Sequence, residues 1–200
     1  MNNGVAAAAI LVVLAFAGVV LGGVGGGLTF SDLATDDVDD ALITIELPHH
    51  EVHEGHHFTV TDSATINAGV LNRKVWRFTT PNNATQCHLI LTFTSSLSGV
   101  LSFNANPTVN AAGSGLSEYN NNRNSVKTAQ LTAFKDTTLT GDGTPLSVLV
   151  IGTSAPATRI GGVGRISTEW ILKMNEDYVL IFQADNANTL ISVVAEWYEV

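Results

Sequence analysis

The chain has 200 residues, of which 45% are hydrophobic and 14% charged, and its formal net charge is -9 at pH 7. All of that net charge lies in the first third: residues 1–72 hold nine acidic and no basic side chains, whereas residues 73–200 hold nine of each. This distribution repels phosphates and argues against a nucleic-acid-binding protein. The single cysteine, Cys87, excludes an intrachain disulfide, so stability must come from packing or assembly.

Residues 1–30 form an apolar segment that carries no ionisable side chain. Its central part, residues 5–28, is long enough to span a bilayer as a helix, for which about 20 residues suffice. We predict an anchor, either helical or extended, with three open fates: a cleaved signal peptide, a membrane helix, or burial between protein subunits. The first is disfavoured because no basic residue precedes Arg73. Glycines four apart, such as Gly18 and Gly22, would allow close helix packing.

An acidic stretch, residues 31–42, follows the apolar segment directly. Its carboxylates are Asp32, Asp36, Asp37, Asp39 and Asp40. We interpret the stretch as a solvated linker. A Ca²⁺ site is the alternative, because carboxylate oxygens suit that ion, but the complete loop pattern with a central Gly and a terminal Glu is missing.

The remainder, residues 43–200, reads as one all-β domain. Short runs that alternate or are rich in β-branched residues are separated by Gly, Asn, Pro and Ser clusters, which is typical of an antiparallel β-sandwich of jelly-roll type. No amphipathic helix is predicted. The predicted strands are Ile43–Leu47, His57–Thr61, Val75–Thr80, His88–Thr94, Val100–Asn104, Val126–Phe134, Leu146–Ile151, Trp170–Met174, Tyr178–Gln183 and Leu190–Tyr198.

Two local signals refine this domain. The stretches 81–83 and 141–143 predict turns, and Asp142-Gly143 in particular predicts a tight hairpin because it tolerates positive φ. Cys87 precedes an apolar strand, so we expect a small buried side chain rather than a nucleophile.

The densest cluster of metal-ligating side chains holds five of the six histidines and two glutamates within nine residues. Pro48 and Gly55 disfavour a helix, and the H-E-x-x-H pattern of zinc hydrolases is absent. In a strand, His49, Glu51 and His53 would share one face, and two imidazoles can bind one divalent metal. We therefore predict these three residues as metal ligands. The alternative is a polar strand and turn whose histidines bond their neighbours or titrate near neutral pH.

Catalytic machinery is not evident in the sequence. No Ser-His-Asp spacing, paired carboxylates or cofactor fingerprint can be argued, so we predict a protein that is not an enzyme and that needs no cofactor beyond the divalent metal. The polar tract Tyr119–Ser125 has two readings. It could bind sugar, or it could be an ordered loop whose Asn side chains bond their own backbone.

Five short segments, in this order, resemble small tailed-bacteriophage proteins that are associated with the virion and lie on the head surface. The resemblance covers about residues 46–199, and the family pattern begins near the histidine cluster. The apolar N-terminus is therefore an addition to it. The segments are His49–Phe58, Phe78–Asn82, Tyr119–Ser125, Trp170–Lys173 and Glu196–Glu199.

The resemblance implies a non-enzymatic virion structural protein, namely a capsid decoration, spike or head-fibre subunit. Its expected partners are capsid subunits and copies of itself, and a trimer is one expected form because jelly-roll heads often form trimers. The anchor would contact lipid through residues 5–28 in a viral membrane, or penetrate between capsid subunits on the capsid surface. The alternative is a membrane-anchored module of the cell envelope that binds glycan or metal.

Overall fold

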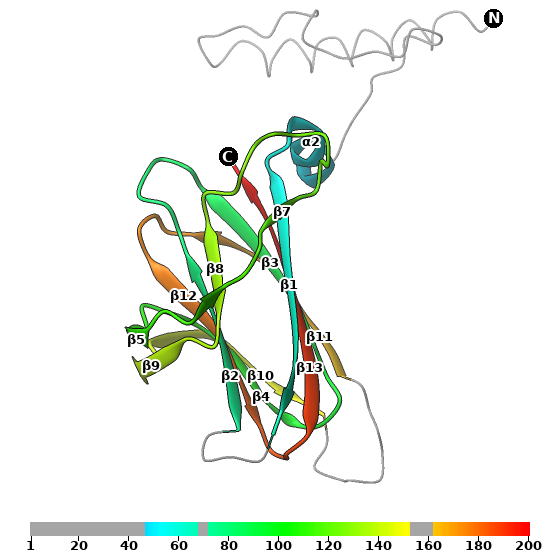
Figure 1. The fold of residues 1–200 in the computed structure, drawn as a ribbon, viewed down its shortest axis with the longest axis vertical. Helices are drawn as coiled ribbons and strands as arrows, with labels where there is room; N and C mark the ends of the chain where they lie inside the picture. The colour runs from blue at the N-terminus through cyan, green and yellow to red at the C-terminus, as the bar shows by residue number, and fades with distance from the viewer. Residues whose placement is uncertain (1–46, 68–71, 153–161) are drawn as a thin grey trace, which may run out of the picture. The chain divides into compact units, whose positions relative to one another are not determined.

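The computed structural model describes residues 47–67, 72–152 and 162–200 (Figure 1). They belong to one compact unit, Glu46–Val200. The predicted anchor (1–30) and acidic linker (31–42) lie outside the described residues. Among the described helices, none has the length and apolarity that crossing a membrane requires.

The described chain consists of one short helix and thirteen strands. Their bounds are α2 (Leu47–Glu54), β1 (His57–Ile66), β2 (Arg73–Thr79), β3 (Cys87–Ser95), β4 (Gly99–Ala105), β5 (Thr108–Ala111), β6 (Ser114–Gly115), β7 (Tyr119–Asn120), β8 (Thr132–Lys135), β9 (Thr138–Gly141), β10 (Thr144–Ile151), β11 (Gly162–Leu172), β12 (Asp177–Ala184) and β13 (Thr189–Glu199).

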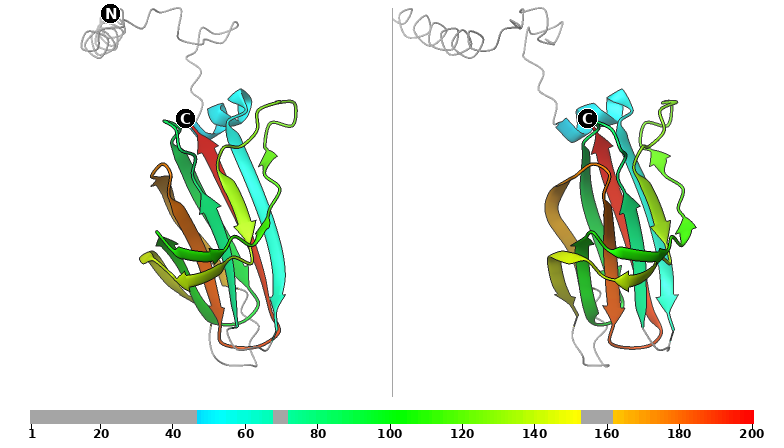
Figure 2. Two further views of the ribbon diagram at one scale, coloured as in Figure 1. Left: turned by 60° about the vertical axis from the view of Figure 1, so that its left-hand side comes forward. Right: turned by 90° about the vertical axis from the view of Figure 1, so that its left-hand side faces the viewer.

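Two antiparallel sheets pack face to face, which confirms the predicted all-β antiparallel sandwich. The first sheet has the strand order β11-β3-β13-β1-β7, and the second has the order β10-β4-β12-β2-β8-β6. A separate ribbon, β5-β9, crosses the second sheet (Figure 2). Leu139 of that ribbon packs on the outward-facing side chains Val75, Val179 and Ile181. In the first sheet β13 lies between β3 and β1, so the last strand pairs with the first along its whole length.

Alternation along the strands sends every second side chain into the space between the sheets. The Phe93 ring of β3 is fully buried there. It lies 6.0 Å from the Trp76 ring and 4.8 Å from the Phe182 ring, both of which belong to the opposite sheet. Burying each such side chain contributes roughly 1.5–3 kcal/mol, so this aromatic cluster is the principal source of cohesion between the layers.

Eight of the ten predicted strands overlap β1, β2, β3, β4, β10, β11, β12 and β13. The predicted strand Val126–Phe134 is wrong in its first half, where the described chain is irregular until β8 begins at Thr132. Of Ile43–Leu47, only Leu47 is described, and it begins α2.

The predicted hairpin at Asp142-Gly143 is also wrong, although its local conformation is right. Gly143 has a φ of 79°, as the sequence predicts. However, β9 before the turn pairs with β5, and β10 after it pairs with β4. The turn therefore carries the chain from the ribbon into the second sheet. A positive φ determines where the backbone reverses, but not which strands then pair.

Candidate functional site

The first part of the histidine cluster, as far as Glu54, is helical, so the interpretation of His49, Glu51 and His53 as a strand is wrong. Pro48 lies in the first turn of α2, where no backbone N–H is needed. At the other end Gly55 has a φ of 74°. Its N–H donates to Val52 O at 3.1 Å, and the His56 N–H donates to Glu51 O at 2.9 Å. These two bonds form a Schellman cap, so the residues that disfavoured a helix are in fact its boundary signals.

Helical geometry separates the three predicted metal ligands. His49 and His53 lie one turn apart on an exposed face, with Nε2 atoms 3.0 Å apart and ring centroids 4.8 Å apart. Glu51 points elsewhere and is buried. The structure thus brings the two histidines together and excludes the carboxylate, because a period of 3.6 residues replaces the period of 2. Within the described ranges, no group of three or more His, Cys, Asp or Glu side chains is arranged to hold a metal ion.

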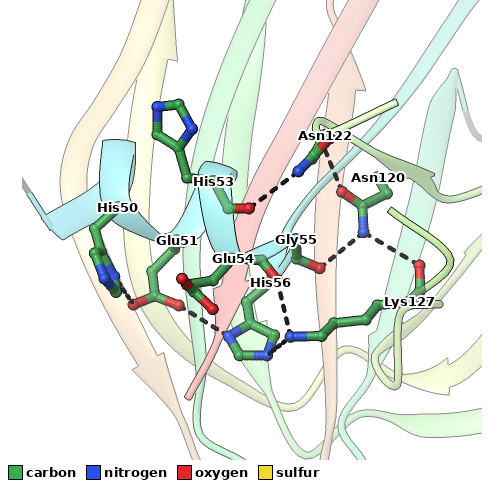
Figure 3. Close-up of polar contacts among 9 residues, drawn as sticks. All are labelled: His50, Glu51, His53, Glu54, Gly55, His56, Asn120, Asn122 and Lys127. Carbon is green, nitrogen blue, oxygen red and sulfur yellow. Dashed lines mark hydrogen bonds and ion pairs between the residues drawn. The ribbon is translucent and has the colours of Figure 1, made fainter. Parts of the chain in front are cut away.

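Glu51 is the centre of a second group on α2, shown in Figure 3. Its Oε1 lies 3.3 Å from His50 Nδ1, and its Oε2 lies 3.1 Å from His56 Nδ1. Lys127 Nζ lies 2.7 Å from His56 Nε2 and donates to Glu54 O at 2.8 Å. Because an ammonium only donates, Nε2 of His56 is the acceptor and its Nδ1–H donates to Glu51. The result is a chain of polar contacts that ties α2 to residue 127.

Residues 119–131, here called the strap, run alongside α2 (Figure 3). Asn120 Nδ2 donates to Gly55 O at 2.8 Å, and Asn122 Nδ2 donates to His53 O at 3.0 Å. Their Oδ1 atoms accept from the backbone N–H groups two residues ahead, those of Asn122 and Asn124. The reading of this tract as an ordered loop bonded to its own backbone is confirmed. We refer to α2 and the strap together as the polar end.

Glu199 holds the last residues of the strap. Its carboxylate is buried at the end of β13 and accepts from the backbone N–H groups of Gln130 and Leu131, each at 2.9 Å, and from Trp197 Nε1 at 2.9 Å. The carboxylate thus satisfies the backbone N–H groups of a segment that the sequence predicts as strand. An apolar residue such as Leu131 predicts a strand because it is buried. Its backbone N–H, however, donates to the Glu199 side chain and not to a neighbouring strand.

A hollow of about 370 Å³ opens beside this carboxylate, and its lining includes His56, Lys127, Gln130 and Glu199. One cation, one imidazole, one amide and one carboxylate therefore face a common space. Such a set can orient a small polar group by hydrogen bonds. The cation and the imidazole already contact each other, as described above.

On the outer face of the first sheet, a row of polar side chains crosses four strands. His57, Tyr198 and His88 are cross-strand neighbours. The Tyr198 hydroxyl donates to Glu169 Oε1 at 2.6 Å, and His88 Nδ1 lies 2.5 Å from the same atom. Burial and the bond to Glu169 raise the pKa of Tyr198 to about 12, whereas the Tyr198 and His88 bonds lower the pKa of Glu169. Burial lowers the pKa of His57.

Sequence reasoning overlooked His88 and Glu169. The signal that was available is the alternation of β3, which puts His88 on the face opposite Leu89. The adjacent Cys87 is buried, as predicted, and burial together with Glu199 raises its pKa to about 12. Its thiol is therefore protonated near neutral pH and is a poor nucleophile.

Comparison of the chain with models of protein families, with curated proteins and with solved structures gave no match. Function has to be inferred from the sequence pattern and the geometry of the chain itself.

Proposed function

We propose that this chain is a non-enzymatic structural protein of a virion, a capsid decoration, spike or head-fibre subunit whose sandwich is attached to a larger assembly through residues 1–30. The observation that carries the proposal is the joining, in one chain, of an apolar segment without ionisable groups to a β-sandwich with a mixed polar surface. An apolar segment of that length needs lipid or protein around it. The ordered resemblance to virion-associated phage proteins favours the virion over other assemblies.

The outer edge of β10 supports a homo-oligomer. Among the described strands, β10 pairs only with β4. Pro145 and the register shift between Pro145 and Ser147 protect the start of this edge. Its residues are uncharged, and Leu146, Val148 and Val150 are 40%, 60% and 73% exposed. Monomeric proteins usually protect such an edge with charges, or cover it. A second copy of the chain that pairs along this edge would satisfy its backbone groups and bury the three side chains. The molar mass of the purified protein in solution, measured in the absence of virus particles, distinguishes a dimer from the trimer that is expected by analogy.

The test compares attachment of two charge-matched variants to particles. The double substitution Leu11→Asp and Leu14→Asp places charges in the apolar segment, where each costs roughly 2.5–3.5 kcal/mol if lipid surrounds it. Ser31→Asp with Thr35→Asp adds the same charge to the acidic stretch. We expect the first variant, like a deletion of residues 2–30, to be absent from purified particles and the second to be retained. Normal incorporation of the deletion variant would refute the proposal.

The second candidate is a membrane-anchored module of the cell envelope, which the exposed pair His49 and His53 favours because two imidazoles can hold a ligand. It predicts that the full chain fractionates with envelope membranes in cells that make no particles. It also predicts binding to an envelope glycan or a metal with submicromolar affinity. Titration with glycan fragments and with Zn²⁺ separates these ligands.

A further inference from the structure

We propose that His49 and His53 form a two-histidine site for a transition metal on the exposed face of α2, with Zn²⁺ as the representative ion and water at the remaining positions. The site is independent of the proposed virion role, because it requires only the helix and its two imidazoles. It differs from the ligand set that the sequence predicts, because Glu51 is not a member.

The separation of the two nitrogens carries this inference. Two imidazole nitrogens, each about 2.0–2.1 Å from one ion, are about 2.9 Å apart at a right angle and about 3.4 Å apart at the tetrahedral angle. The observed separation of the His49 and His53 Nε2 atoms, 3.0 Å, lies within that range. A rotation of the two rings about their side-chain torsions would then direct both lone pairs at one ion, with no change in the backbone. In the absence of metal, one ring donates its Nε2–H to the other, and a tautomer change frees that nitrogen for the ion.

The backbone that carries the two rings is held in place before an ion arrives. The Schellman cap at Gly55 ends α2, and the His53 carbonyl accepts from Asn122 Nδ2 at 3.0 Å. Binding an ion therefore requires little further loss of backbone freedom, and the cost falls on the side-chain torsions of the two imidazoles. Both imidazoles are exposed to solvent, so an ion reaches them without an opening motion.

The donor set selects the kind of metal. Imidazole suits Zn²⁺, Cu²⁺ and Ni²⁺, whereas Mg²⁺ and Ca²⁺ require oxygen ligands. In the part of the chain that the structure describes, no third His, Cys, Asp or Glu joins the pair. Of the two acidic side chains of α2, Glu51 is buried between His50 and His56, and Glu54 lies five residues from His49, off its face. The site is thus open, and its ion should exchange readily.

The experiment titrates untagged full-length chain with ZnCl₂, followed by calorimetry and by imidazole NMR signals, with MgCl₂ as the negative probe. We expect His49→Gln and His53→Gln each to weaken Zn²⁺ binding at least about tenfold. His50→Gln, which removes an imidazole outside the pair, should leave the affinity unchanged. Thermal unfolding without metal shows whether each variant is folded.

A composition-matched variant sharpens the test. In a His50→Gln background, exchanging two neighbours, His53→Glu with Glu54→His, keeps every residue type but moves the second imidazole to a spacing of five, off the face of His49. The His50→Gln change is needed because an imidazole at position 54 would otherwise lie one turn from His50. We expect the same loss of Zn²⁺ binding as in His53→Gln. The proposal is overturned if the exchanged variant or His49→Gln binds Zn²⁺ as the original chain does, or if His50→Gln loses as much affinity as they do.

Discussion

The interior of the sandwich and the polar end are stabilised in different ways. Between the sheets, rings such as Phe93 and Phe182 contact each other through burial, which has little directionality. At the polar end, α2 and the strap are joined by directed contacts among His56, Lys127 and Asn120. The first arrangement provides cohesion for the fold. The second fixes the positions of particular side chains, because hydrogen bonds depend on direction.

The largest expected effect belongs to the interior. Phe93→Ala should lower the free energy of unfolding by about 3–5 kcal/mol, because it removes a fully buried ring and leaves a cavity beside Trp76 and Phe182. Urea denaturation measures the change. Val126→Ala in the strap is the control, since that side chain is 95% exposed and its loss should have almost no effect. Equal losses would remove the distinction between the two regions.

A smaller and more local effect is expected where the two regions meet. Glu199→Gln should destabilise the chain by about 1–2 kcal/mol, because hydrogen bonds to a charged acceptor contribute more than those to a neutral one. Amide hydrogen exchange should rise first at Gln130 and Leu131, whose N–H groups the carboxylate accepts. Glu118→Gln is the control, since that carboxylate accepts only one N–H, at Ala133, among the described contacts. Uniform loss of protection across all strands would contradict a local role.

The smallest expected effect depends on pH. Burial lowers the pKa of His57 below its ordinary 6.5, and Glu196 and Glu51 only partly oppose this. As pH falls, the unfolded chain therefore binds this proton before the folded chain does. The stability linked to His57 is complete above about pH 6.5 and is lost as pH falls through the folded value.

His57→Gln removes that titration and should flatten the dependence of stability on pH below about pH 6.5. Thermal unfolding midpoints at matched ionic strength measure the slope. Phe93→Ala serves as the comparison, since it should lower the midpoint at every pH without changing the slope. An unchanged slope in His57→Gln would show that the buried imidazole does not contribute.

The same contrast explains how far the sequence predicted this molecule. Strands of the interior, such as β3 and β12, were found because alternation of apolar residues follows directly from burial. The sequence does not predict which strands pair, because Asp142-Gly143 indicates a chain reversal but not the sheet in which each flanking strand lies. At the polar end, Pro48 and Gly55 disfavour a helix by their residue type, yet they mark the two ends of a helix of eight residues. The Glu199 bonds to Gln130 and Leu131 join residues far apart in sequence, which no local pattern reveals.

The central place of β13 in the first sheet has a consequence for the timing of folding. Since β13 separates β1 from β3, neither of those strands can acquire this shared neighbour until almost the whole domain has been synthesised. The apolar segment, residues 1–30, leaves the ribosome long before that moment. During translation, therefore, the nascent chain exposes its apolar segment while the sandwich is still incomplete. Early binding of that segment to lipid or protein would protect the nascent chain from aggregation.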